Sequence, residues 1–98
     1  MTVRVYYLQK PSQFVFDLKN ELKFNITNSC IDIYLCNYLD ELKAFANIRK
    51  SPCIYKIAIV NKLKASEISE YTKMVDDIYS SKNNYKDVAQ RICLKILR

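Results

Sequence analysis

Apolar and polar positions recur at two different spacings along this chain, which predicts strands interleaved with helices. Residues 2–8 are mostly β-branched and aromatic, the composition of a strand. Phe14, Leu18 and Leu22 then recur at every fourth position. Side chains at that spacing share one face of a helix, which we expect over residues 13–23.

The middle of the chain predicts two more strands and two more helices. Alternating apolar positions indicate strands at 30–36 and 53–60, with a short helix between them at 39–49. In the next segment the apolar residues advance by three and four positions; they are Ile68, Tyr71, Val75, Ile78 and Tyr79. This spacing predicts one long helix over 66–81 with a single buried face.

The end of the chain supports two interpretations, a strand or a helix. Residues 91–98 alternate well enough for a last strand, while a helix over 85–97 is the competing interpretation. With the strand, the predicted fold class is α+β. It is a two-layer sandwich of a small mixed, mostly antiparallel sheet with two main helices on one face, plus a short inserted helix. We expect residues 1–98 to form a single domain, with 37–52 as an insertion.

Composition narrows the function classes further. A chain of 98 residues with 50% hydrophobic residues builds one modest core. It has no His and no Gly, so the commonest general base is missing, as are the phosphate loops and nucleophile turns that need glycine backbone. No apolar run approaches the ~18 residues that cross a bilayer, and the first residues lack a signal-peptide pattern. We expect a cytoplasmic protein that is not an enzyme and has no cofactor, no membrane partner and no small-molecule substrate.

The four cysteines predict neither a metal site nor a redox pair. They are Cys30, Cys36, Cys53 and Cys93, with no close Cys pair and no His to complete a zinc site. Small buried thiols are the common form of such residues in a reducing compartment. The sequence therefore favours four free, largely buried thiols over a disulfide or a metal.

Positive charge gathers in the last part of the chain. The formal net charge is +6, and residues 82–98 hold five basic side chains against one acidic one. Lys and Arg neutralise phosphates, and neighbouring Asn and Tyr side chains can hydrogen-bond or stack on an exposed base. A solvated basic face that keeps a small domain soluble is the alternative. The charge alone leaves RNA binding and this alternative open.

Two segments resemble a known family. Residues 71–87 carry tyrosines at 71 and 79 and end in Lys-Asn-Asn-Tyr-Lys-Asp, and residues 14–25 combine a Phe/Leu stripe with a Leu-Lys-Phe-Asn end. Both are similar to helices of the eukaryotic large-subunit ribosomal protein twenty-two family, and the strand at 56–60 occurs in the family's order. The resemblance covers about two thirds of the chain, at 2–28 and 54–90.

The resemblance implies a function and a set of contacts. It implies a structural constituent of the cytosolic large ribosomal subunit, a non-catalytic ribonucleoprotein component in translation that binds rRNA through a basic helix end and the adjacent strand. Its partners would be large-subunit rRNA and neighbouring ribosomal proteins. The family implies RNA contact through five residues, and local charge adds two more: Lys73, Lys82, Asn83, Asn84 and Lys86, then Arg91 and Lys95. Lys73 also suits a solvated helix position, and the two asparagines also suit a helix end.

The chain departs from that family in ways that keep other functions open. It lacks the family's glycine-rich turn, and Asp76 and Asp77 stand where the long helix is usually basic. A non-catalytic thioredoxin-like adaptor is one alternative, because Pro52 precedes a strong strand after β-α-β-α. That fold needs the helix at 39–49 as an integral layer, whereas the ribosomal interpretation treats it as an appendage. A small viral or host-directed protein-binding module with no RNA role is the other.

Overall fold

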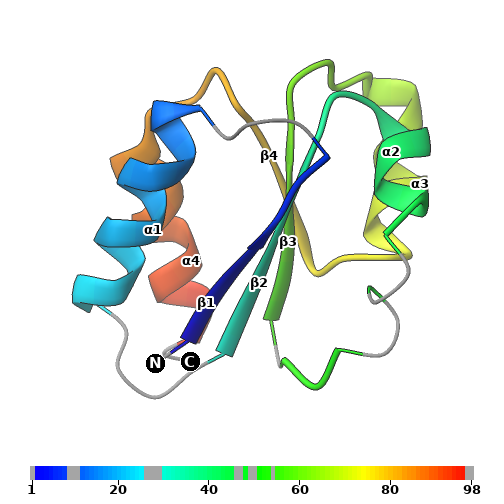
Figure 1. Ribbon diagram of the computed structural model, residues 1–98. Helices are drawn as coiled ribbons and strands as arrows, with labels where there is room; N and C mark the ends of the chain where they lie inside the picture. The colour runs from blue at the N-terminus through cyan, green and yellow to red at the C-terminus, as the bar shows by residue number, and fades with distance from the viewer. Residues whose placement is uncertain are drawn as a thin grey trace.

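One four-stranded sheet stands between two pairs of helices in the computed structural model of the chain (Figure 1). The structure describes residues 2–8, 12–25, 30–45, 48, 51–53 and 55–96. Each of the four strands is followed by a helix, so the chain is a run of β-α units. The elements are β1 (Thr2–Tyr6), α1 (Gln13–Asn25), β2 (Cys30–Cys36), α2 (Leu39–Lys43), β3 (Tyr55–Val60), the 3₁₀ helix η1 (Ala65–Glu67), α3 (Ile68–Thr72), β4 (Asp77–Ser80) and α4 (Tyr85–Ile96).

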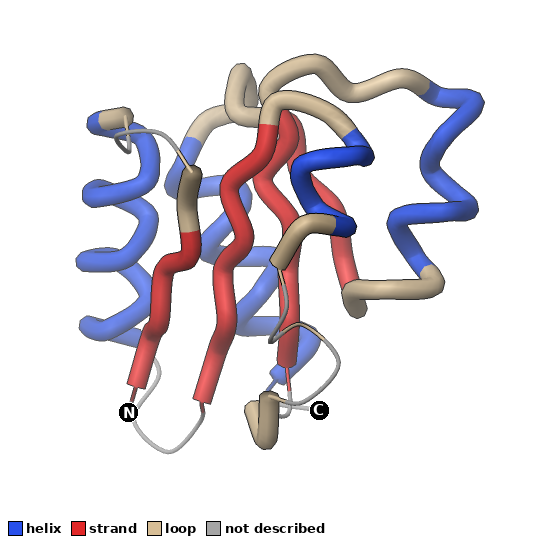
Figure 2. Tube along the Cα trace, turned by 45° about the vertical axis from the view of Figure 1, so that its right-hand side comes forward, coloured by secondary structure: helices blue, strands red, loops and turns tan. Residues whose placement is uncertain are grey.

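All strand pairs are parallel, and the strand order is the sequence order, β1-β2-β3-β4. Helices α1 and α4 cover one face, and α2 and α3 cover the other. In Figure 2 the strands run upward and each next strand lies to the right, with α2 and α3 in front of the sheet. The β2-α2-β3 and β3-α3-β4 connections are therefore right-handed, while α1 lies behind the sheet and makes β1-α1-β2 left-handed. About 98% of such connections are right-handed, so this crossover is a rare feature.

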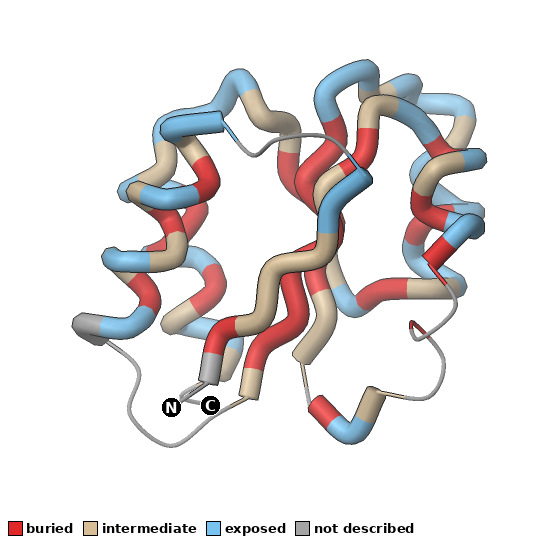
Figure 3. The backbone as a smooth tube through the Cα atoms, viewed as in Figure 1, coloured by how far each residue is buried: buried red, intermediate tan, exposed pale blue. Residues whose placement is uncertain are grey.

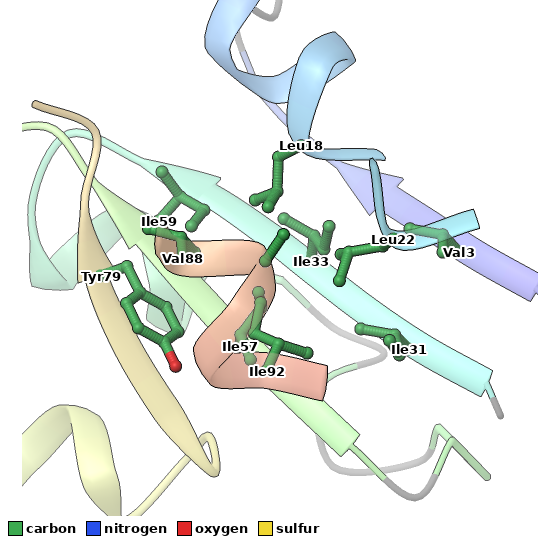
Figure 4. Close-up of a cluster of buried hydrophobic side chains, with 11 residues drawn as sticks. Val3, Leu18, Leu22, Ile31, Ile33, Ile57, Ile59, Tyr79, Val88 and Ile92 are labelled. Carbon is green, nitrogen blue, oxygen red and sulfur yellow. The ribbon is translucent and has the colours of Figure 1, made fainter. Parts of the chain in front are cut away.

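Both faces of the central strands are buried, which gives the fold two cores (Figure 3). On the α1/α4 face, Ile33 and Ile57 pack against Leu18, Leu22 and the inner residues of α4 (Figure 4). On the α2/α3 face, a second cluster contains Tyr34, Leu42, Ala58, Val60 and Tyr71. Strands covered on both sides are typical of parallel sheets. The three layers follow from these two clusters.

The predicted fold class is wrong: the sheet is parallel rather than mostly antiparallel, and helices cover both faces. The segment predicted as one long helix is wrong as well. Residues 66–81 form a 3₁₀ turn, the short helix α3 and the strand β4. Their apolar residues do not share a face, because Tyr71 and Val75 belong to one core and Tyr79 to the other. A spacing of three and four was thus produced by a helix, a turn and a strand in succession.

The last element is the helix α4, so the competing helical interpretation of 85–97 is confirmed and the strand at 91–98 is wrong. The expected helix at 13–23 and strand at 30–36 are confirmed. Helix α2 is shorter than the predicted 39–49; residues 46–47 and 49–50 lie outside the described part of the chain.

Helix α2 belongs to one of the three layers of the fold. Leu39, Leu42 and Phe45 are buried in the second core together with Ile48, so this part of the 37–52 segment is not an appendage. That satisfies one requirement of the thioredoxin-like alternative. A thioredoxin-like fold needs a mixed sheet, however, and the described sheet is parallel throughout.

The hydroxyl of Tyr71 gives a first test of the packing. Tyr71 is fully buried, as expected for a core residue, and its Oη has no hydrogen-bond partner among the described residues. An unsatisfied buried hydroxyl costs about 1–3 kcal/mol, whereas an apolar ring of the same shape does not. We expect Tyr71→Phe to raise the free energy of unfolding by about 1 kcal/mol in urea denaturation. A destabilised variant would show that the hydroxyl has a partner.

Candidate functional site

A cavity of about 510 Å³ lies where the strands end and the helices begin. Its size falls within the range of small-ligand sites, about 300–1,000 Å³. Four segments of the chain contribute to its lining, each from the carboxyl end of a different strand or the start of the helix that follows. The lining residues are Leu8, Ser12–Val15, Leu35–Asn37, Glu41, Ile59, Asn61, Ser81 and Lys82.

The topology explains why a cavity opens at this edge. After β1 the chain turns to the α1/α4 face, and after the neighbouring strand β2 it turns to the other face (Figure 1). The same divergence occurs between β3 and β4. Where adjacent connections leave in opposite directions, a crevice forms outside the carboxyl ends of the strands, and ligands of open α/β sheets bind there. We call this cavity the crevice.

A row of hydrogen bonds crosses the floor of the crevice from α2 to β4. The backbone N–H of Asn37 donates to Glu41 Oε1 at 2.7 Å. Asn61 Nδ2 donates to Asn37 Oδ1 at 3.1 Å, and Ser81 Oγ donates to Asn61 Oδ1 at 3.0 Å. The row fixes the two asparagine side chains and leaves Asn37 Nδ2 with no partner among the described residues.

Two neighbouring turns beside the crevice carry exposed lysines. We call residues 61–64 and 81–84 the lysine turns; they follow β3 and β4, and Asn61 and Ser81 join them. Lys62, Lys64 and Lys82 are exposed in these turns. Lys86 is exposed in the first turn of α4, where its backbone N–H donates to Asn84 Oδ1 at 2.8 Å. Four exposed ammonium groups therefore lie on one half of the carboxyl edge.

The other half of this edge carries exposed aromatic side chains. Tyr7 follows β1 and is 52% exposed, and Tyr38 follows β2 and is 48% exposed. Leu8, which lines the crevice, is 57% exposed. Exposed tyrosines beside lysines provide both stacking surfaces and phosphate partners for single-stranded nucleic acid.

The structure brings together four of the seven residues predicted to contact RNA. Lys82, Asn83, Asn84 and Lys86 lie within one turn and the start of α4, all exposed. Asn83 and Asn84 do not end a helix as the alternative proposed; Asn84 instead accepts a hydrogen bond at the start of α4.

The remaining three predicted residues lie elsewhere. Lys73 follows α3 at the amino edge of the sheet and pairs with Glu70 at 3.3 Å, and Lys95 lies in the last turn of α4. Arg91 is exposed along α4. The expected continuous basic edge, made from a helix end and a following strand, is therefore not formed.

Lys95 has a structural partner. Its ammonium group forms an ion pair with Asp77, which also accepts a hydrogen bond from Tyr79 Oη at 2.5 Å. Burial acts to raise the pKa of Asp77, but the hydrogen bonds from Lys95, Tyr79 and the Ile78 N–H outweigh it and hold this pKa below its usual value. This lowered pKa contributes stability above the unfolded-state value near 3.9, and the contribution is lost as the pH falls through the folded-state pKa.

We therefore expect Lys95→Ala to lower the free energy of unfolding at pH 7 by at most about 1 kcal/mol, since the lysine is half exposed. The difference from the wild type should shrink as the pH falls through the lowered folded-state pKa of Asp77. Affinity for RNA should change less than about twofold. Denaturant titrations at pH 7 and pH 3 check the first point. If Lys95→Ala lost much of its RNA affinity without losing stability, Lys95 would be a binding residue and not a structural one.

The sequence interpretation missed Lys62, Lys64 and the crevice-lining asparagines. The available signal was the polar run Asn-Lys-Leu-Lys directly after the most apolar strand. In a parallel sheet such a run lies at the same edge as the turn after every other strand. An antiparallel expectation placed these turns at different edges and hid the cluster.

A second polar cluster lies toward the amino edge and has a structural role. Asp32 is fully buried in β2, and Arg4, its register partner on β1, donates from Nε to Asp32 Oδ1 at 2.9 Å. Tyr34 Oη and the Ser51 hydroxyl also donate to this carboxylate. Arg4 Nη2 extends to Cys53 Sγ at 3.2 Å.

The prediction of four free thiols is wrong for two of them. Cys30 and Cys53 form a disulfide that ties the start of β2 to the segment before β3, while Cys36 and Cys93 are free. Ligand atoms of Cys30, Asp32 and Cys53 lie within 4.8 Å of one another, a spacing that could hold a metal ion. The two sulfurs are bonded to each other and the carboxylate is paired with Arg4, so these groups are already engaged.

Burial holds the thiol that lines the crevice in its unreactive, protonated form. Burial raises the pKa of the Cys36 thiol to about 12, with a smaller contribution from the charge of Glu41. The thiol is therefore protonated at neutral pH, and Glu41 accepts the Asn37 N–H. The arrangement suits binding better than covalent chemistry.

None of the helices in the described part of the chain is both long and apolar enough to span a bilayer. Comparisons with protein-family models, curated proteins and solved structures find no match to this chain.

Proposed function

We propose that the protein is a non-catalytic RNA-binding protein that holds RNA at the carboxyl edge of its sheet. The observation that carries this proposal is the gathering of Lys62, Lys64, Lys82 and Lys86 on two adjacent turns beside the crevice. Phosphates of the RNA backbone contact these ammonium groups, and binding is dominated by the release of counterions.

The polar side chains around the lysines support a nucleic acid over other polyanions. Asn83 and Asn84 are exposed between the lysines and offer amide groups to sugar or base atoms. Tyr7 and Tyr38 are exposed on the neighbouring connections and offer rings for base stacking. A polyanion without bases would make no stacking contact with these rings.

Ribosomal RNA is the RNA to test first. The resemblance to the ribosomal family names large-subunit rRNA and neighbouring ribosomal proteins as partners, in a structural role in the cytoplasmic ribosome. That part of the proposal rests on the sequence segments alone. The binding edge itself rests on the placement of the lysines and is independent of the family.

The absence of catalysis is part of the proposal. The chain has no histidine. The thiol of Cys36 is protonated, and the Glu41 carboxylate is occupied by a backbone N–H. A nucleophilic thiol has to lose its proton, and burial together with the charge of Glu41 opposes that loss at Cys36.

The test is a charge reversal on the lysine turns and α4. We expect Lys82→Glu with Lys86→Glu to weaken binding to rRNA fragments at least about tenfold at low salt, since two phosphate contacts are lost and two repulsions gained. Both residues are exposed, so the melting temperature should stay within about 2 °C.

The matched control is Lys23→Glu with Lys43→Glu. These two lysines are also exposed, in the last turns of α1 and α2, and they neither line the crevice nor belong to the lysine turns. The control makes the same change in net charge, and its RNA affinity should fall by less than about threefold. RNA affinity is measured by fluorescence anisotropy. Equal losses of affinity in the two double variants would mean that binding depends only on the net charge and that the protein has no specific binding edge.

A further inference from the structure

We infer that the crevice holds one unstacked nucleotide of the bound RNA, with its base inside and its phosphate on Lys82. This inference rests on the proposed function and adds the ligand unit that the crevice accepts. It explains why a concave site adjoins the lysine turns, where backbone binding alone needs only a flat basic surface.

The crevice has an apolar side that suits the faces of a planar ring. Phe14 and Val15 from α1 lie opposite Leu35 and Ile59, which come from the ends of β2 and β3. Val15 and Ile59 are buried, so this side belongs to the rigid core of the protein. Apolar walls around a volume of about 510 Å³ leave room for a base and its ribose.

The hydrogen-bonded row offers groups to the edge of such a ring. Asn37 Oδ1 is occupied by Asn61 Nδ2, which fixes the orientation of the Asn37 amide. Asn37 Nδ2 keeps both hydrogens for a ligand, because it has no partner among the described residues. A fixed amide donor is the usual partner of ring nitrogens and carbonyl oxygens on a nucleobase edge.

The charged end of the site lies on the same lining. Lys82 lines the crevice and belongs to the lysine turns, so this residue joins the two. The 5′-phosphate of a nucleotide whose base occupies the crevice is placed on Lys82, while the adjoining phosphates continue toward Lys62 and Lys86. The apolar side, the fixed amide and the lysine match the faces of the base, its edge and the phosphate.

The experiment is an amide NMR titration of the full chain with nucleoside 5′-monophosphates and with ribose 5-phosphate. Ribose 5-phosphate carries the same sugar and phosphate and lacks the base. We expect at least one monophosphate to shift the amide signals of Asn37, Asn61 and Lys82 and to bind at least about tenfold more tightly than ribose 5-phosphate. Equal affinities, or shifts confined to other parts of the protein, would overturn the inference.

Two variants separate the crevice from general electrostatics. Asn37→Asp removes the amide donor and adds a negative charge inside the crevice, whereas Asn20→Asp adds the same charge at an exposed position of α1 outside its lining. We expect a loss of at least tenfold in monophosphate affinity for the first and less than threefold for the second. If Asn37→Asp does not fold, Ser12→Trp serves in its place, because this exposed lining residue can fill the crevice from solvent. Equal losses for Asn37→Asp and Asn20→Asp, or full affinity in Ser12→Trp, would contradict a base-binding crevice.

The same protein samples are tested for binding to RNA oligonucleotides. Salt-dependent RNA binding without a preference for the base-bearing monophosphate would refute the crevice inference and leave the proposed function intact. Base-dependent binding of a monophosphate without RNA binding would refute the proposed function and leave a free nucleotide as the ligand of the crevice.

Discussion

Replacing Asp32 by alanine is expected to lower the free energy of unfolding by about 3 kcal/mol. The carboxylate is fully buried and accepts hydrogen bonds from Arg4, Tyr34 and Ser51. Its removal leaves those donors without their acceptor and deprives Arg4 of its counter-charge, which is the costly way to break a buried pair. For a domain of this size the melting temperature should fall by roughly 12–24 °C.

Asp32→Asn is the matched control. The amide keeps an oxygen that can accept one of the three donors and has nearly the same shape, so the loss should be smaller than for alanine. Thermal and urea unfolding of both variants measure the difference. If Asp32→Ala were as stable as the wild type, the buried carboxylate would not organise the packing of β1 against β2.

Removing the disulfide is expected to have an effect of similar size. The bond between Cys30 and Cys53 closes a loop with a sequence separation of 23 residues, which includes β2 and α2. A cross-link of that span restricts the unfolded chain and stabilises the folded state by about 3 kcal/mol. Cys30→Ser with Cys53→Ser should therefore melt well below the wild type.

A reductant provides the internal control. Dithiothreitol should lower the melting temperature of the wild type toward that of the double serine variant, and it should leave the variant itself unchanged. Cys93→Ser, which alters a free thiol, should show the full response to the reductant. A wild-type protein that melts at the same temperature with and without reductant would contradict the disulfide.

The sequence was informative where one local pattern coincided with one element. The repeat of Phe14, Leu18 and Leu22 predicted α1 because all three lie on a helix that packs on a single core. The run 30–36 predicted β2 because its composition is strand-like on both faces. In these segments the local preference and the tertiary contacts agree.

The segment 66–81 shows why the rest could not be predicted. Val75 and Tyr79 are four residues apart, as on a helix, but they belong to different cores on opposite faces of the sheet. Periodicity cannot distinguish one face of a long helix from a short helix and a strand that serve two cores. The helical spacing hid the strand β4. The predicted elements nevertheless alternated strand and helix, which is typical of a parallel sheet, so the mostly antiparallel sheet did not follow from those elements.

The candidate site could be predicted only in part for a related reason. The basic run after residue 81 was visible in the sequence, and four of its predicted contacts lie together in the structure. The crevice depends on residues from four connections that only the topology brings to one edge. The left-handed β1-α1-β2 crossover made the crevice harder still to predict. It places α1 and α2 on opposite faces of the sheet although the strands follow the sequence order.

The salt dependence of RNA binding tests the account most directly. The dissociation constant for a single-stranded RNA is measured between about 50 and 200 mM KCl for the wild type and for Lys82→Glu with Lys86→Glu. Four phosphate contacts predict a slope of about 3 for log Kd against log salt, and the double variant should lose about 1.4 of it. A wild-type slope near zero, or the same slope in both proteins, would show that these lysines do not bind RNA phosphates.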